Sequence, residues 1–296
     1  MKNFKNILVA LDLTEMDNNL LRFAGFFSKK YAVDQLSLAH IIPSLVLPES
    51  VKDIVHSVVS PGFQLDSMVR EKMNEEIQAN LGKDLNAGTS INVMVEEGKP
   101  FKNLVKICKQ TNAELLLVGK KKSGTSGGIV SKMVARMVEC AVCFVTENAS
   151  PAFTNILVPM DFSDYSMRAI QLGRELTADA GGAKITALHI LDYPPTAEYL
   201  TRKYGLLAPD WENRLEELFL KTLERHHISG KGIEFIALKN EYFDTAQHIR
   251  EFADSTKADI ILMGAKGHHA FDDLFLGSVT EKLVTIADTV PVLIVR

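Results

Sequence analysis

Short apolar runs alternate with longer amphipathic segments along the whole chain. In the first half, runs rich in isoleucine, leucine and valine predict buried strands at 7–11, 36–42, 91–95, 115–118 and 142–145. Between these runs, apolar residues recur every three or four positions, as Leu20, Phe23 and Phe27 do, which predicts helices. Thr14 and Asp17 have the spacing of a capping box at the start of the first helix. Strands separated by helices are typical of parallel βαβ units with right-handed crossovers.

The second half repeats the pattern of the first half. Its apolar runs predict strands at 156–158, 185–190, 233–238, 260–263 and 291–295. The segment FKNILVALD, which begins at Phe4, matches FTNILVPMD, which begins at Phe153, at an offset of 149 residues (153 − 4). The same offset relates His40 to His189. Self-similarity over this distance indicates a tandem duplication.

A short polar segment that ends in Pro151 separates the two halves. We therefore expect one domain over residues 1–148 and a second over residues 152–296. Each domain should be a doubly wound, Rossmann-like α/β domain with five parallel strands. A ligand of such a sheet binds outside the carboxyl ends of the strands. Asp161 and Gly264 both follow strand ends in the second half, so we expect them to face one crevice.

Composition narrows the class of protein. The 33 lysine and arginine residues and 37 aspartate and glutamate residues give a formal net charge of −4, which argues against a general nucleic-acid binder. No apolar run approaches the ~20 residues that span a bilayer, and the N-terminal run is too short for a signal peptide. Three cysteines suggest no disulfide framework. We expect a cytoplasmic protein that binds neither nucleic acid nor membrane.

A glycine-bearing segment after the fourth strand of the second half carries the strongest chemical signal. Gly264, Gly267, Gly277 and Ser278 are spaced as G-x2-G-x9-G-S, and the residues that follow have helical character. Glycines let a backbone approach a phosphate closely, and a helix N-terminus presents N–H groups and a favourable dipole to an anion. The segment therefore predicts a nucleotide phosphate site. The alternative is a tight turn that leads into a helix and holds no ligand.

This spacing resembles the nucleotide-binding signature of the universal stress protein family. Because of the repeat, each half of the chain resembles one domain of this family, so the resemblance covers nearly the whole chain. It implies two tandem domains with the fold of the adenine nucleotide alpha hydrolases, pairing through their last strands within one chain. It also implies ATP or a related adenine nucleotide, with or without Mg²⁺, in the second half. A homodimer of the whole chain is left open.

The resemblance assigns the nucleotide site residue by residue. Asp161 matches the family's aspartate at the adenine or ribose edge, although it also has the position of a helix cap. Apolar and backbone atoms would hold the base, and the glycine segment would cradle the phosphates, with Lys266 within reach of them. The expected nucleotide-binding residues are Pro159, Met160, Asp161, Ile190, Met263, Gly264, Lys266, Gly267, Gly277, Ser278, Val279 and Thr280.

The first half departs from the signature. Lys122 stands where the second half has Gly267, and Val130 replaces Gly277. The glycine, serine and lysine content of this loop could still bind an anion, but it is not a P-loop, because G-x4-G-K-(S/T) is absent. We expect a degenerate site, kept for domain pairing. Its residues would be Asp12, Gly119, Lys121 and Ser131.

Other candidate residues give weaker signals for metal binding or catalysis. His268 and His269 lack partners with metal-ligand spacing, Asp272 and Asp273 more often face solvent than Mg²⁺, and no nucleophile, base and orienting group form a set. We therefore expect no catalytic residues and no metal site. The expected function is regulatory nucleotide binding in a stress response. A slow ATPase or phosphotransferase and a nucleotide-free protein-interaction module remain as alternatives.

Overall fold

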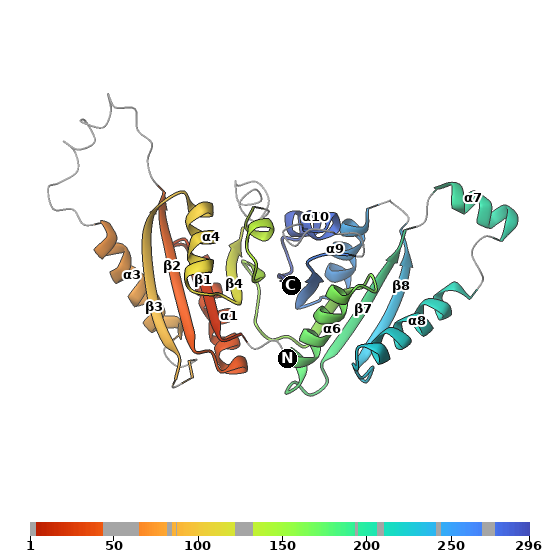
Figure 1. Ribbon diagram of the computed structural model, residues 1–296, viewed down its shortest axis with the longest axis horizontal. Helices are drawn as coiled ribbons and strands as arrows, with labels where there is room; N and C mark the ends of the chain where they lie inside the picture. Colours follow the sequence, from red (N-terminus) through yellow and green to blue (C-terminus); the bar gives the residue numbers. More distant parts are fainter. Residues whose placement is uncertain are drawn as a thin grey trace, which may run out of the picture. The chain divides into compact units, whose positions relative to one another are not determined.

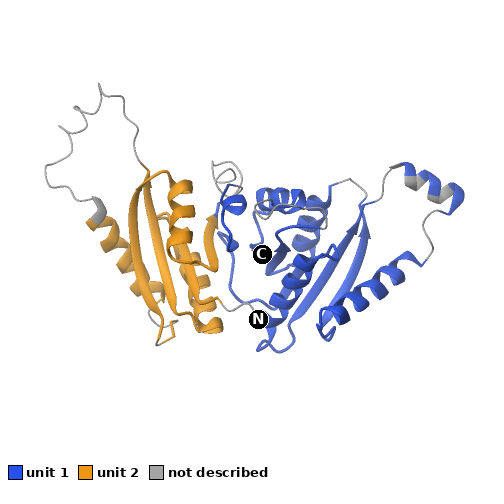
Figure 2. Ribbon diagram, in the orientation of Figure 1, with its two compact units in different colours: residues 1–2, 120–296 blue, residues 3–119 orange. Residues whose placement is uncertain are grey.

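The computed structural model of the chain describes residues 4–43, 65–81, 85–86, 88–121, 133–192, 195–205, 210–240, 244–267 and 276–296. The chain forms two compact units (Figure 1, Figure 2). Residues 3–119 make up the N-terminal unit, and residues 120–296, with residues 1–2, make up the C-terminal unit. Each unit is an α/β structure.

In the described part of the N-terminal unit, parallel strands lie in the order β3-β2-β1-β4. The strands are β1 (Asn6–Leu11), β2 (Gln35–Pro43), β3 (Ser90–Gly98) and β4 (Leu115–Lys120), the last residue of which is counted with the other unit. The helices are α1 (Met16–Tyr31), α3 (Leu65–Leu81) and α4 (Pro100–Gln110). The predicted apolar face of α1 is buried, with Leu20 and Phe23 at most 1% exposed, because it packs on the sheet.

In the described part of the C-terminal unit, the strand order is β5-β10-β9-β6-β7-β8. The strands are β5 (Ala141–Thr146), β6 (Asn155–Pro159), β7 (Lys184–Leu191), β8 (Ile233–Lys239), β9 (Ile260–Gly264) and β10 (Val292–Val295). The helices are α6 (Asp164–Thr177), α7 (Pro195–Tyr204), α8 (Trp211–Arg225), α9 (Thr245–Thr256) and α10 (Ser278–Ile286). Each predicted strand lies within two or three residues of an observed one, so the apolar runs placed the sheet correctly.

The last strands of the two sequence repeats pair with each other. β5 runs antiparallel to β10, with Phe144 opposite Val292 and Cys143 opposite Leu293. The predicted pairing through the last strands is therefore confirmed. Because β5 is hydrogen-bonded to β10, β5 is grouped with the strands of the second repeat, and the compact units divide at residue 119. Cys143 is fully buried in this strand, and burial raises the pKa of its thiol far above the ordinary value.

The start of α1 differs from the capping box that the sequence suggests. The Thr14 hydroxyl donates to the Asp12 carboxylate at 2.5 Å instead of accepting from the helix. The carboxylate of Asp17 accepts from the N–H groups of Asp12 at 3.1 Å and Leu13 at 2.8 Å. Leu13 has a φ of 60°, so the chain turns sharply there and carries these N–H groups back towards the helix. A local spacing rule does not anticipate that turn.

The start of α6 shows which residue caps the second-half helix. Ser163 is the N-cap, and its hydroxyl accepts from Ser166 N at 3.3 Å. Asp161 accepts from Ser163 N at 3.1 Å and from its hydroxyl at 2.5 Å. Phe162 has a φ of 64°, which repeats the left-handed turn at Leu13. Asp161 therefore does not cap α6 itself but holds the capping residue, so its second oxygen is directed elsewhere.

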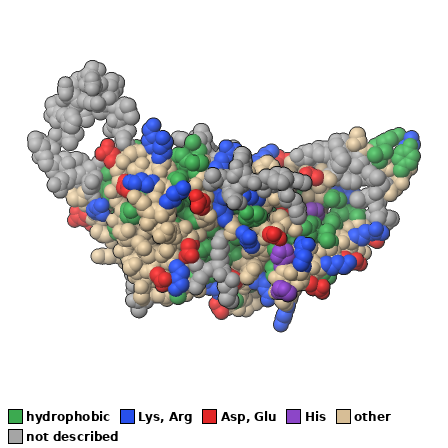
Figure 3. Space-filling view, in the orientation of Figure 1, with side chains coloured by type: hydrophobic (Ala, Val, Ile, Leu, Met, Phe, Trp, Pro, Cys, Tyr) green, Lys and Arg blue, Asp and Glu red, His purple; other side chains and the backbone are tan. Residues whose placement is uncertain are grey.

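An apolar surface lies on α7. Tyr199, Leu200 and Tyr204 are 61%, 38% and 67% exposed, and hydrophobic side chains gather over this helix in Figure 3. The ammonium of Lys203 donates to the Tyr199 hydroxyl at 3.1 Å and lies over both tyrosine rings. Among the described residues, no helix is both long enough and apolar enough to cross a membrane.

Candidate functional site

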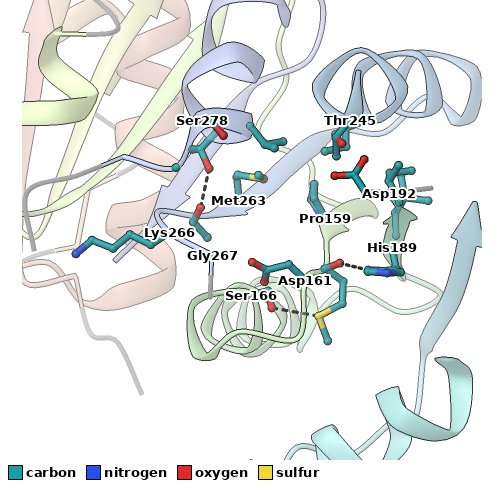
Figure 4. A pocket seen from close by; sticks show the side chains of 18 of the residues that line it. Pro159, Asp161, Ser166, His189, Asp192, Thr245, Met263, Lys266, Gly267 and Ser278 are labelled. Atoms are coloured by element: carbon teal, nitrogen blue, oxygen red, sulfur yellow. Dashed lines mark hydrogen bonds between the residues drawn. The ribbon is translucent and has the colours of Figure 1, made fainter. Parts of the chain in front are cut away.

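One cavity of about 860 Å³ opens at the carboxyl ends of β6, β7 and β9. All the residues predicted to bind a nucleotide line it, so strand ends far apart in the sequence converge as the doubly wound fold requires. Figure 4 shows four residues around this space: Asp161 after β6, His189 in β7, Asp192 directly after β7, and Ser278 at the start of α10. The lining also contains residues that the sequence did not single out. These are Ser166, Leu188, His189, Leu191, Asp192, Thr245, Ile249 and Leu276.

Two glycines of the motif are required by close contacts. A Cβ at Gly264 would lie 3.0 Å from the backbone carbon of Tyr165, so a side chain there would push α6 away from β9. A Cβ at Gly267 would lie 2.7 Å from Oδ2 of Asp161. Gly267 therefore lets the glycine segment pass directly beside the Asp161 carboxylate. The lysine at the corresponding position of the first half could not occupy this space without displacing the carboxylate.

The N-terminus of α10 forms one wall of the cavity. Gly277 is the N-cap residue, and its N–H donates to Ala265 O at 2.9 Å, which fixes the helix start to the end of β9. The Thr280 hydroxyl donates to Gly264 O at 3.0 Å and is a second link between α10 and the end of β9. Gly277 has no side chain to cap the helix, and the first N–H groups of an α-helix lack partners within the helix. These groups, and the helix dipole, favour an anion at Ser278 and Val279.

His189 is a lining residue that the sequence analysis noted only as part of the repeat. Its Nδ1 lies 2.8 Å from Met160 O, and His40 makes the same contact with Leu11 O at 2.9 Å. Burial lowers the pKa of His189, outweighing the hydrogen bond and the nearby carboxylates that raise it. The neutral ring donates from Nδ1, because a carbonyl only accepts, and so Nε2 remains an acceptor. The repeated histidine was the signal that could have identified this residue.

A polar cluster closes the cavity beyond the end of β7. Asn240 is buried, and its amide donates to Asp192 at 2.6 Å and to the Thr245 hydroxyl at 3.1 Å. Asp244 caps α9 by accepting from Gln247 N, and Lys282 of α10 donates to it at 2.7 Å, which lowers the pKa of Asp244. α9 and α10 pack side by side (Figure 1). The cluster therefore joins the end of β7 to the helix that walls the cavity.

Lys266 lines the cavity, and both its carbonyl and its ammonium make contacts within the unit. Its carbonyl accepts from the Ser163 hydroxyl at 3.4 Å, which ties the glycine segment to the start of α6. Its ammonium lies 5.8 Å from the centre of the Tyr165 ring. In Figure 4 the side chain extends away from Asp161 and His189. A phosphate contact by this ammonium would need a change of side-chain conformation.

The first half carries only part of the corresponding arrangement. Asp12 follows β1 as Asp161 follows β6, and a Cβ at Gly119 would lie 2.8 Å from the Met16 side chain. Lys121 belongs to the other compact unit, and Ser131 lies outside the described residues. Asp17 stands at the repeat position of Ser166 and is fully buried. A buried carboxylate therefore occupies the place where the cavity of the second half has a serine.

Asp17 should make the stability of the N-terminal unit depend on pH. Burial raises its pKa to about 6, further supported by the charges of Asp12 and Glu76 and opposed by the N–H groups of Asp12 and Leu13. The folded state takes up a proton at a pH where the unfolded carboxylate stays ionised, so stability is gained as pH falls through about 6 and lost as it rises. We expect the stability difference between the wild type and Asp17→Asn to change between pH 7.5 and 5, measured by urea unfolding. Parallel pH profiles for the two proteins would contradict this assignment.

Several residues that the sequence analysis considered lie outside the described ranges. His268, His269, Asp272 and Asp273 lie outside the described residues, as do Lys122 and Val130. Within the described ranges, no three histidine, cysteine, aspartate or glutamate side chains gather in a way that could hold a metal ion. No disulfide joins the cysteines of these ranges, Cys108, Cys140 and Cys143. The hydroxyls of Ser166 and Thr280 donate to Ser163 O, Met160 Sδ and Gly264 O, not to His189.

Comparisons with known proteins agree with the repeat and the fold. The chain is 34% identical over 144 residues to a universal stress protein of Thermus aquaticus, covering 49% of this chain and 99% of that protein. It is 27% identical over 157 residues to one of Methanocaldococcus jannaschii, covering 51% and 87%. A universal stress protein structure from Archaeoglobus fulgidus aligns over 99% of this chain and 98% of its own, with a TM-score of 0.66 and 18% identity. The profile of the Universal stress protein family matches residues 3–146 and again residues 152–296, and the chain therefore belongs to the universal stress protein family, with two tandem copies of its domain.

Proposed function

We propose that the cavity of the C-terminal unit binds ATP or a related adenine nucleotide and that the protein acts as a nucleotide-dependent regulator in a stress response. The observation that carries the proposal is the convergence of Asp161, Gly267 and the N-terminus of α10 on one cavity. An anion-binding helix start, a close backbone approach and a carboxylate are the groups that a nucleotide needs at its phosphates and its sugar.

The cavity suits a ligand of this size and mixed polarity. A volume of about 860 Å³ lies within the usual range of small-molecule sites. Pro159, Ile190 and Met263 offer apolar surface to a base, while Ser278 and Val279 present backbone N–H groups to phosphates. Asp161 and the acceptor nitrogen of His189 would receive hydrogen bonds from an exocyclic amine or sugar hydroxyls.

The test is calorimetric titration of the full chain with Mg-ATP. We expect about one site per chain, because only the second half of the sequence contains the complete G-x2-G-x9-G-S signature. Two sites would show that the loop of the first half also binds a nucleotide. Absence of binding, with ATP, ADP and AMP all tried, would overturn the proposal and favour the nucleotide-free interaction module.

Regulation is favoured over turnover by the hydrogen bonds of the lining. The neutral His189 already donates to Met160 O, and the hydroxyls of Ser166 and Thr280 donate to the backbone or to sulfur rather than to the His189 ring, which argues against an activated nucleophile at either residue. Phosphate release from Mg-ATP distinguishes the two roles. Release by the wild type above that by Gly277→Asp would support a slow ATPase, and retained binding without release would support the regulatory role.

A further inference from the structure

The helix that walls the cavity is held by residues of the first sequence repeat. Arg136 lies in a helical turn at 133–137, and its Nη2 and Nε donate to Oε2 of Glu281 in α10 at 2.5 and 3.2 Å. Lys120 donates to the carbonyls of Val284 and Ala287 at the other end of α10. Arg296 donates to Ala135 O at 2.5 Å and fastens the turn that carries Arg136. All these residues belong to the C-terminal unit.

Glu281 stands in the turn that the phosphates would approach. It is in the first turn of α10, directly after the lining residues Ser278, Val279 and Thr280, and its side chain is 22% exposed. A carboxylate there interacts well with the helix dipole but repels a bound phosphate. The guanidinium of Arg136 places a positive charge against this carboxylate. Because Arg136 is 56% exposed, the ion pair by itself should add little to folding stability.

We propose that Arg136 is an electrostatic positioning residue for the phosphate end of the site, so that the first repeat sets how strongly the second repeat prefers a nucleotide to a nucleoside. The inference rests on the proposed function. Arg136 acts through Glu281: it offsets the carboxylate's charge and holds that side chain by two hydrogen bonds. The first repeat, which lacks the complete glycine signature, would thereby contribute to ligand binding in the second repeat.

A charge effect and a merely structural contact predict different results. If Arg136 offsets the charge of Glu281, its removal should weaken ligands in proportion to their phosphate charge, and removal of Glu281 should restore binding. If the ion pair only holds the helix in place, ATP and adenosine should weaken alike, and loss of Glu281 should not restore either. The two partners therefore form a double-mutant cycle with a built-in control ligand.

The experiment compares the full-length wild type with Arg136→Gln, Glu281→Gln and the double variant, titrated with Mg-ATP and with adenosine. We expect Arg136→Gln to weaken Mg-ATP about fivefold and adenosine less than about twofold. The double variant should return to within about twofold of the wild type. Arg136→Lys, which keeps the positive charge, should bind Mg-ATP nearly as well as the wild type.

Three outcomes would overturn the inference. Equal weakening of ATP and adenosine in Arg136→Gln would assign the residue a structural role. Unchanged ATP binding in Arg136→Gln would show that the charge of Glu281 does not reach the phosphates. Either result leaves the proposed function standing, because the wild type still binds ATP. A wild type that binds neither ligand would overturn the proposed function, and this inference with it.

Discussion

Replacing Gly277 with aspartate should weaken Mg-ATP binding by at least about 100-fold while leaving the protein folded. Gly277 has a φ of −61°, which any residue adopts, and an added Cβ would meet its nearest atom, the Thr280 hydroxyl, at 3.5 Å. Aspartate is also a favourable N-cap residue, so α10 should begin where it does now. The new carboxylate, however, would take the N–H groups of the first turn and repel the phosphates.

The matched control is Gly277→Asn, which has the same size and the same capping ability without the charge. We expect it to bind Mg-ATP within about tenfold of the wild type, and both variants to unfold within about 1 kcal/mol of it. Calorimetric titration and urea unfolding measure the two quantities. If Gly277→Asp bound Mg-ATP as tightly as Gly277→Asn, the phosphates could not lie at the start of α10.

Truncating Phe144 to alanine should destabilise the unit that carries the site, although Phe144 belongs to the first sequence repeat. Its side chain is fully buried in β5, and the residue lies opposite Val292 of β10. Removal of a buried phenylalanine side chain leaves a cavity and costs about 3–5 kcal/mol of unfolding free energy. The backbone amides of β10 should therefore exchange with deuterium much faster, and Mg-ATP binding should weaken as α10 loses its support.

Leu116→Ala is the control, because Leu116 is equally buried but lies in β4, which pairs with β1 of the N-terminal unit. We expect it to accelerate amide exchange in β1 and β2 and to leave β10 protected. Hydrogen exchange under native conditions resolves the two units without assuming that they unfold together. Loss of protection in β1 rather than β10 upon Phe144→Ala would show that β5 is coupled to its own repeat instead.

Much of the fold could be predicted because buried parallel strands leave an unambiguous trace in the sequence. The run around Ile261, for example, is apolar on both faces and ends in glycine, as a central strand does when it leads into a ligand loop. The repeat supports these predictions, because each strand predicted in one half has a counterpart in the other half. One expectation depended on local spacing alone and was wrong: the capping box at Thr14 is replaced by a left-handed turn at Leu13.

The sequence predicts the residues of the candidate site that follow strand ends. It does not predict the residues that only tertiary contacts bring to the site. Asp161 and Gly264 follow apolar runs, so the doubly wound topology brings them together. Asp192 and Thr245 line the cavity from segments that are far apart in the sequence, and the buried Asn240 bonds to both. The contact of Arg136 with Glu281 spans 145 residues and has no counterpart in any local motif.

The pairing of β5 with β10 has a consequence for how this chain can associate. In the described part of the structure, β10 is hydrogen-bonded along both sides, to β9 and to β5. Because both last strands belong to one chain, each meets the other at an effective concentration set by the connecting chain, on the order of millimolar. Dilution should not separate them, and β10 presents no open edge to which another strand could add. A second copy of the protein would have to recognise a different surface.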